Sequence, residues 1–190
     1  MARRSARSPS RLGVAGSILA AAICVALIGL LVVRFTAATH AVVASAAHPL
    51  NRHIAPDVTI SLWNGTPNAT LELARLRGQP VILNFWASWC EACQQESPLL
   101  AAAWQHYHAH GVVFLGAALD TPPADGVQFL RQFATPYPAG AVPTEATATA
   151  FHLIGLPATM FIDRSGTVVS RVDGQLTAST LANGLRSIVG

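Results

Sequence analysis

The chain has 190 residues, 52% of them apolar, and a formal net charge of +3. This length is enough for one ordinary domain with additions, and the apolar fraction is high for a soluble protein. No basic patch is interleaved with aromatic residues, so the sequence does not indicate nucleic-acid binding. All 12 cationic residues are arginine, and five of them lie in residues 1–34, which contain no acid. Residues 35–190 hold seven arginines and nine acidic residues, a net charge of −2.

Residues 12–33 carry neither a charge nor a proline. As a helix, these 22 residues would be about 33 Å long, enough to cross a bilayer core. Four arginines precede the segment and only Arg34 follows it closely, so residues 1–11 are expected in the cytoplasm and the remainder outside. The alternative is a signal peptide cut near residues 44–46, although its apolar core would usually be shorter, about 7–15 residues. We therefore expect a single-pass anchor in the cell membrane, with the folded part on the extracytoplasmic side.

Residues 34–53 are rich in small residues and predict a linker without a core of its own. A folded domain is expected over residues 54–190. Its expected elements, in chain order, are a strand over 58–62, a turn at 64–65, a buried strand over 81–86, a helix over about 90–109, a strand over 112–119, a helix over 124–134, a short helix over 145–151, strands over 158–163 and 167–172, and a helix over 178–188. The alternation of strands and helices predicts an α/β fold with a central sheet.

Cys90 and Cys93 are the only cysteines after the apolar segment. They follow a buried strand and stand three residues apart at the expected start of a helix. Unpaired N–H groups and the dipole at a helix N-terminus stabilise a thiolate, which is the attacking species in disulfide exchange. Cys93, one turn later, can then displace the mixed disulfide. The spacing predicts an exposed nucleophile, Cys90, and a buried resolving residue, Cys93.

A zinc site is the main alternative use of this cysteine pair. Structural zinc needs four ligands, and the sequence has no second Cys-x-x-Cys. His106 and His110 share one face of the expected helix, but their place at its end favours solvated side chains near the negative end of the dipole. We therefore expect neither a metal nor another cofactor.

Residues 84–93, Asn-Phe-Trp-Ala-Ser-Trp-Cys-Glu-Ala-Cys, resemble the active-site region of thioredoxin-like proteins. Further matches lie at residues 55–57, 96–98 and 155–163. Together they resemble the TlpA/ResA type of membrane-anchored thiol–disulfide oxidoreductases, which includes reductants of cytochrome c maturation. The resemblance covers about residues 54–190. It implies a thioredoxin-like fold, a central mixed sheet flanked by helices, with an N-terminal hairpin and an extra α/β insertion.

The resemblance also implies roles for residues around the cysteines. Pro157 is expected to be cis and to face the pair, so that the backbone of Leu156 can bind an extended substrate. Glu96 is expected close to the pair, where partial burial would raise its pKa and let it relay a proton. Plain thioredoxins carry an aspartate where this chain has Asn84, which strengthens the case for Glu96. Trp89 is expected on the surface beside the cysteines, in contact with substrate.

These features predict an enzyme that reduces disulfides of exported proteins, such as apocytochrome c, with electrons from a membrane thiol donor. An oxidant of the same fold would form disulfides instead, and Glu91-Ala92 between the cysteines does not settle the direction. A non-enzymatic metal-delivery or chaperone module could use the same pair. Peroxide reduction is disfavoured, because Leu83 and Ala87 stand where the peroxidase motif has proline and threonine.

Overall fold

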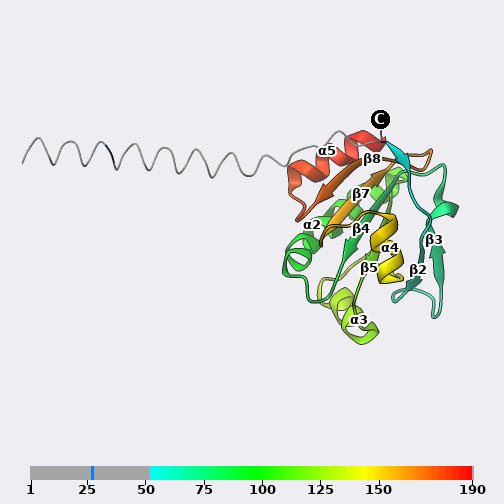
Figure 1. Ribbon diagram of the computed structural model, residues 1–190, viewed down its shortest axis with the longest axis vertical. Helices are drawn as coiled ribbons and strands as arrows, with labels where there is room; N and C mark the ends of the chain where they lie inside the picture. Colours follow the sequence, from blue (N-terminus) through cyan, green and yellow to red (C-terminus); the bar gives the residue numbers. More distant parts are fainter. Residues whose placement is uncertain (1–26, 28–51, 190) are drawn as a thin grey trace, which may run out of the picture. The chain divides into compact units, whose positions relative to one another are not determined.

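The computed structural model describes residue 27 and residues 52–189, and the described part is built on one eight-stranded sheet (Figure 1). Its strands are β1 (His53–Ile54), β2 (Thr59–Leu62), β3 (Thr70–Glu72), β4 (Val81–Trp86), β5 (Val113–Ala118), β6 (Ala139–Ala141), β7 (Ala158–Ile162) and β8 (Thr167–Asp173). Their order across the sheet is β1-β8-β7-β4-β5-β6-β2-β3. β4, β5 and β6 are parallel, whereas β7 and β8 run antiparallel to their neighbours. The expected mixed sheet and the N-terminal hairpin, formed by β2 and β3, are confirmed.

Helices cover both faces of this sheet. They are η1 (Leu73–Leu76), α2 (Glu91–Tyr107), η2 (His108–His110), α3 (Pro123–Gln132), α4 (Thr144–Ala150) and α5 (Ala178–Val189). α2 and α5 pack on one face, where Leu100 and Leu185 join a buried cluster with Ile82 of β4. The opposite face is covered by residues 55–60, η1 and the end of α4, and Figure 1 shows α4 lying across β4 and β5.

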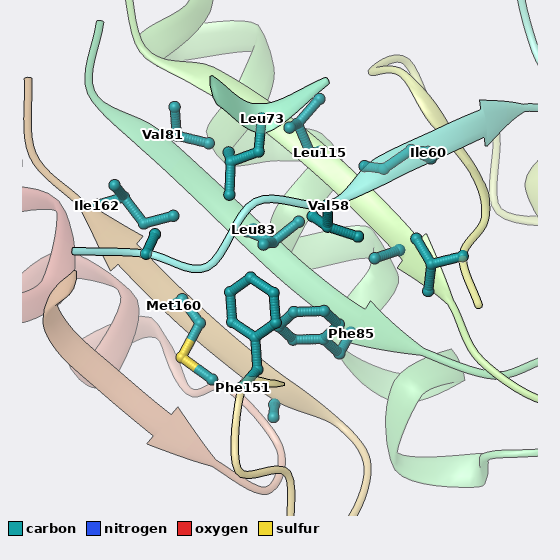
Figure 2. Close-up of a cluster of buried hydrophobic side chains, with 14 of the residues drawn as sticks. Val58, Ile60, Leu73, Val81, Leu83, Phe85, Leu115, Phe151, Met160 and Ile162 are labelled. Carbon is teal, nitrogen blue, oxygen red and sulfur yellow. The ribbon is translucent and has the colours of Figure 1, made fainter. Parts of the chain in front are cut away.

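β4 forms the centre of the sheet and is buried on both faces. Figure 2 shows Leu83 and Phe85 among the side chains of one face, with Phe151, which follows α4, lying over Phe85. The ring centroids of Phe85 and Phe151 are 4.9 Å apart. Because side chains alternate along a strand, Asn84 points to the other face, toward α2. The only polar side chain of β4 is therefore directed to the helix that carries the cysteines.

The expected cytoplasmic N-terminus (1–11), the anchor (12–33) and most of the linker (34–53) lie outside the described residues, apart from residues 27, 52 and 53. Among the described residues, no helix combines the length and the apolar character that a membrane crossing requires. β1 begins at His53, one residue before the expected start of the domain.

Gly184 in α5 permits a close approach to the sheet, which gives a test of the packing. A Cβ at this position would lie 2.2 Å from the Phe161 ring, and Phe161 is fully buried. We expect Gly184→Ala to lower the free energy of unfolding by about 1–3 kcal/mol, because the clash outweighs the better helix propensity of alanine, worth about 1 kcal/mol. Urea unfolding measures the change.

Gly155→Ala is the matched control, because a Cβ there meets no atom within 4 Å. Its stability should be unchanged or raised by up to about 1 kcal/mol. Equal stability of the two variants would contradict the close packing of α5 on β7.

Candidate active site

A short turn after β4 places the cysteines at the edge of the sheet where β4 has its C-terminal end. Cys90 is the N-cap of α2, with extended backbone angles, and its Sγ accepts a hydrogen bond from the backbone N–H of Cys93 at 3.2 Å. The Ser88 N–H donates to Thr121 Oγ1 at 3.1 Å, and Gln94 Nε2 donates to the Ser88 carbonyl at 3.1 Å. The turn is thus tied both to the segment after β5 and to the first turn of α2. Cys90 Sγ receives an N–H bond that would also stabilise a thiolate.

The two cysteines form a disulfide, with an Sγ–Sγ distance of 2.02 Å. Cys93 is 1% exposed, as expected for the resolving residue, but Cys90 is only 6% exposed. The expected exposure of Cys90 is therefore wrong for this disulfide form. Its side chain belongs to a buried cluster with Trp86 and Ala87, against which Leu156 packs.

The segment before β7 lies beside the cysteine turn. The Leu156–Pro157 peptide bond is cis, as the resemblance implies. Ala158, the next residue, is paired with Phe85 of β4, so Leu156 and Pro157 lie next to the residues that follow β4. Leu156 packs against the cluster that contains both cysteines. Contact of Leu156 and Pro157 with a substrate stays a prediction.

Glu96 is buried one turn after Cys93 and sits in a closed polar network. Its side chain is 1% exposed. Oε1 accepts a hydrogen bond from Asn84 Nδ2 at 2.7 Å, and Oε2 accepts one from the Leu176 N–H at 2.6 Å. Asn84 Nδ2 also donates to Thr159 Oγ1 at 3.0 Å, which joins β4, α2 and β7. Every buried side-chain nitrogen and oxygen of the described residues has a hydrogen-bond partner.

Burial raises the pKa of Glu96 to about 7, while the N–H groups of Leu176 and Asn84 act in the opposite direction. Desolvation disfavours the charged carboxylate, whereas the donated hydrogen bonds favour it. Desolvation also raises the pKa of Tyr137, and the negative charge of Glu96 adds to the effect, so Tyr137 stays protonated. Glu96 can therefore gain or lose a proton near neutral pH, one helical turn from Cys93.

The two tryptophans near the cysteines have different environments. Trp89 is 62% exposed, and its Nε1–H donates to the Asp120 carbonyl at 3.0 Å. Trp86 is buried and stacks on Phe129 of α3, with ring centroids 4.2 Å apart. The expected surface position of Trp89 is observed, and Trp86 is buried as part of the expected buried strand over residues 81–86. Contact between Trp89 and substrate stays a prediction.

Comparison with known proteins agrees with this geometry. The family model described as AhpC/TSA family matches residues 52–171. The chain belongs to this family. Two relatives named thiol-disulfide oxidoreductase ResA are each 29% identical. The one from Bacillus subtilis aligns over 67% of this chain and 69% of its own length, and the one from Geobacillus thermodenitrificans over 70% and 75%.

Solved structures are similar as well. The structure of a Chlorobium tepidum protein assigned as a thiol:disulfide interchange protein DsbE has a TM-score of 0.65 and 27% identity, and it covers 72% of this chain and 96% of its own. The AhpC/TSA member described here is thus a thioredoxin-like thiol–disulfide oxidoreductase of the ResA and DsbE type, and the expected fold and enzyme class are confirmed.

Sequence reasoning named the cysteines and Glu96 but missed most of the network around Glu96. The missed groups are Thr159 Oγ1, the Leu176 N–H and the buried Tyr137. Thr159 lies within a recognised motif, whereas a backbone N–H has no sequence signal. Within residues 52–189, no three His, Cys, Asp or Glu side chains are grouped so that they could hold a metal ion.

Proposed function

We propose that the domain works as a reductant of disulfides in exported proteins. The observation that supports this direction is the pair of carboxyl groups around the cysteines. Glu91 directly follows Cys90, and Glu96 is buried one turn after Cys93. Negative charge at both positions disfavours thiolates, whereas a strong oxidant is one whose reduced form is stabilised. Carboxylates beside the pair therefore favour the disulfide form and a low reduction potential.

The reaction would proceed in two exchanges. The Cys90 thiolate attacks one sulfur of the substrate disulfide, a mixed disulfide forms, and the other substrate sulfur leaves as a thiolate. Cys93 then loses its proton to Glu96 and attacks Cys90 Sγ. The Cys90–Cys93 disulfide forms and the second substrate thiolate leaves. Two electrons have passed to the substrate, and its thiolates take up two protons.

The cis-Pro157 segment would hold the substrate during these exchanges. An extended chain lying along Leu156 could pair with its backbone beside Cys90. Trp89, on the surface next to Cys90, would contact the same chain. Backbone pairing of this kind does not itself depend on the side chains of the substrate, so any selectivity would come from the surface around the disulfide.

The cellular setting belongs to the same proposal. Residues 12–33 would anchor the chain in the cell membrane by a single span, with the catalytic domain on the extracytoplasmic side. A membrane thiol donor would reduce the Cys90–Cys93 disulfide again by the reverse exchanges. Apocytochrome c is the candidate substrate that the resemblance to the TlpA/ResA type suggests.

The reduction potential of Cys90–Cys93 tests the proposed direction. The full-length protein, with Cys24 of the apolar segment 12–33 replaced by serine so that only Cys90 and Cys93 carry thiols, is equilibrated with defined thiol–disulfide buffers, and the reduced fraction is measured by thiol alkylation. We expect a potential near or below about −220 mV, close to that of thioredoxin at about −270 mV. A value near about −120 mV, as in the oxidant DsbA, would reverse the direction and support disulfide formation.

A further inference from the structure

Two apolar side chains stand exposed at the edge of the sheet where the disulfide lies. Ile154 is 85% exposed and precedes the cis-Pro157 segment by two residues, and Trp89 is 62% exposed and precedes Cys90. Neither side chain belongs to a buried hydrophobic cluster. Leu156, between Ile154 and the disulfide, packs on the cluster that contains the cysteines. Apolar side chains therefore flank the disulfide from two different segments of the chain.

Exposed acidic side chains follow the three parallel strands at this same edge. Glu91 comes after β4, Asp120 and Asp125 come after β5, and Glu145 comes after β6. Parallel neighbours end at one edge of a sheet, so all four acids lie at the edge that carries Cys90. Two hydrogen bonds join the segments that follow β4, β5 and β6. Trp89 Nε1 donates to the Asp120 carbonyl, and the Asp120 N–H donates to Thr144 Oγ1, next to Glu145, at 2.9 Å.

The arginines of the described residues are placed elsewhere. Arg75, Arg77 and Arg164 lie at the opposite edge, where Arg77 Nη1 donates to the Ser165 carbonyl and Arg164 Nη1 to the Gly78 carbonyl. Arg171 lies closest to the cis-Pro157 segment, but it is neutralised by Asp173 at 2.6 Å and bound to the carbonyls of Phe151 and His152. Its side chain is only 16% exposed.

The remaining arginines of the described residues form no ion pair with the acids. Arg52 precedes β1 and acts on Asp163, which follows β7 at the opposite edge. Desolvation raises the pKa of Asp163, but hydrogen bonds from Ser165 and Thr167, together with the charge of Arg52, lower it below its ordinary value. Arg131 and Arg186 lie in the last turns of α3 and α5. Among residues 52–189, none of the exposed acids around the disulfide is ion-paired with an arginine.

We propose that this face selects cysteine-bearing polypeptide segments that carry cationic side chains on either side of an apolar residue. The acids Glu91, Asp120, Asp125 and Glu145 would attract the cationic flanks, and Ile154 would cover the apolar residue next to the attacked cysteine. Complementary charge mainly speeds association and rejects wrong partners, and its effect falls with salt. The inference deepens the proposed function and rests on it, because it names the chemical class of the target.

Synthetic peptides with one intramolecular disulfide provide the test. One pair of peptides differs only in its flanks, lysine in one and glutamate in the other, and a second pair differs only in leucine or serine beside the attacked cysteine. The pre-reduced full-length protein, with Cys24→Ser and in a neutral detergent, reduces each peptide. Each ratio of second-order rate constants is divided by the same ratio for dithiothreitol, a neutral thiol, which removes the intrinsic reactivity of the peptides.

We expect the lysine peptide to be favoured by about fivefold or more at low ionic strength. This preference should disappear at about 0.5 M salt. Asp120→Asn with Glu145→Gln should lower the preference by about threefold or more. Glu72→Gln is the control: Glu72 ends β3, is paired with Arg75 at 2.8 Å and does not follow any of the three parallel strands, so this variant should keep the wild-type ratio. Ile154→Ser should remove the preference for leucine over serine, which we expect to be about threefold.

Equal normalised rates for the lysine and glutamate peptides at low salt would overturn the selection by charge. An unchanged leucine preference in Ile154→Ser would overturn the role of Ile154. Both results leave the proposed function intact, because the peptides are still reduced. A protein that reduces neither the peptides nor hydroxyethyl disulfide, a small neutral disulfide, would overturn the proposed function and this inference together.

Discussion

Cys93→Ala should accumulate a covalent adduct with target proteins, whereas wild-type protein releases them. The physical reason is that the Cys90 sulfur attacks the target disulfide and the Cys93 sulfur resolves the mixed disulfide. Cys90 is the N-cap of α2, and its Sγ accepts a hydrogen bond from the Cys93 N–H. Its thiolate is therefore stabilised by the N-terminus of the helix. With alanine at position 93, Cys90 still attacks, but no second thiolate can displace the mixed disulfide.

Cys90→Ala should lose disulfide exchange almost completely, by a factor of about 10³ or more, since the chemistry requires an attacking thiolate. Cys93 cannot take over, because its side chain is 1% exposed and lies one turn inside the helix. The measurement is non-reducing electrophoresis of the full-length protein, with Cys24→Ser, after incubation with peptide disulfides. The double variant Cys90→Ala/Cys93→Ala is the control and should form no adduct.

An adduct on Cys90→Ala in place of Cys93→Ala would invert the two roles. No adduct on either single variant would contradict the two-step exchange, because the first step would then not form a mixed disulfide. Thermal unfolding of both single variants in the reduced form separates loss of chemistry from loss of fold.

The sequence contained enough local signal for the long elements and for the cysteine pair. The apolar run over residues 81–86 matches β4 as the structure has it, because a strand buried on both faces is almost uniformly apolar. The helix after Cys90 was expected from its apolar spacing and ends in η2. Such signals lie within about ten residues of one another, so they can be read without knowing the fold.

The bounds of the short strands cannot be read from the sequence, for the opposite reason. β6 is Ala139–Ala141 and contains no β-branched or aromatic residue. Its strand conformation depends on pairing with β5 and β2 and on Gly140, where a Cβ would lie 1.9 Å from the Ser61 carbonyl oxygen. β1, with two residues, and β3, with three, likewise take their form from a neighbouring strand. Tertiary pairing therefore decides these strands, which local propensity does not encode.

The environment of Glu96 shows the same limit at the active site. Its position three residues after Cys93 was evident from the spacing, but its burial was not. The partners that determine its pKa come from residues 12 and 80 positions away, Asn84 and Leu176. A proton relay through Glu96 could thus be suspected from the sequence, whereas its pKa near neutrality follows only from the folded structure.

Glu96→Gln should slow peptide-disulfide reduction by about tenfold or more at pH 7 and remove an inflection from the pH–rate profile. In the wild type, Glu96 loses its proton as pH rises through about 7, the value to which burial raises its pKa. The carboxylate can then accept the Cys93 proton, so the rate should rise through this region and level off. Glutamine has no titrating group, and its rate should rise only toward the ordinary thiol pKa of about 8.5.

Stability must be measured beside the rate in this variant. Glutamine has one acceptor oxygen where Glu96 accepts from both Asn84 and the Leu176 N–H, so one buried donor loses its partner. The expected loss is about 1–3 kcal/mol in the free energy of unfolding, which the domain should survive. Glu91→Gln is the control for carboxylate loss near the pair, and it should keep the inflection because Glu91 is exposed.

Asn84→Leu separates a role for Glu96 in proton transfer from a purely structural one. Leucine removes an N–H donor that favours the charged carboxylate, so the pKa of Glu96 should rise and the inflection should move above its wild-type position near pH 7. A structural defect would lower the rate at every pH and leave the inflection in place. If Glu96→Gln keeps the wild-type inflection, that titration belongs to another group and Glu96 does not relay the proton. Movement of the inflection in Asn84→Leu together with its loss in Glu96→Gln would assign it to Glu96, because only that carboxyl receives the Asn84 bond.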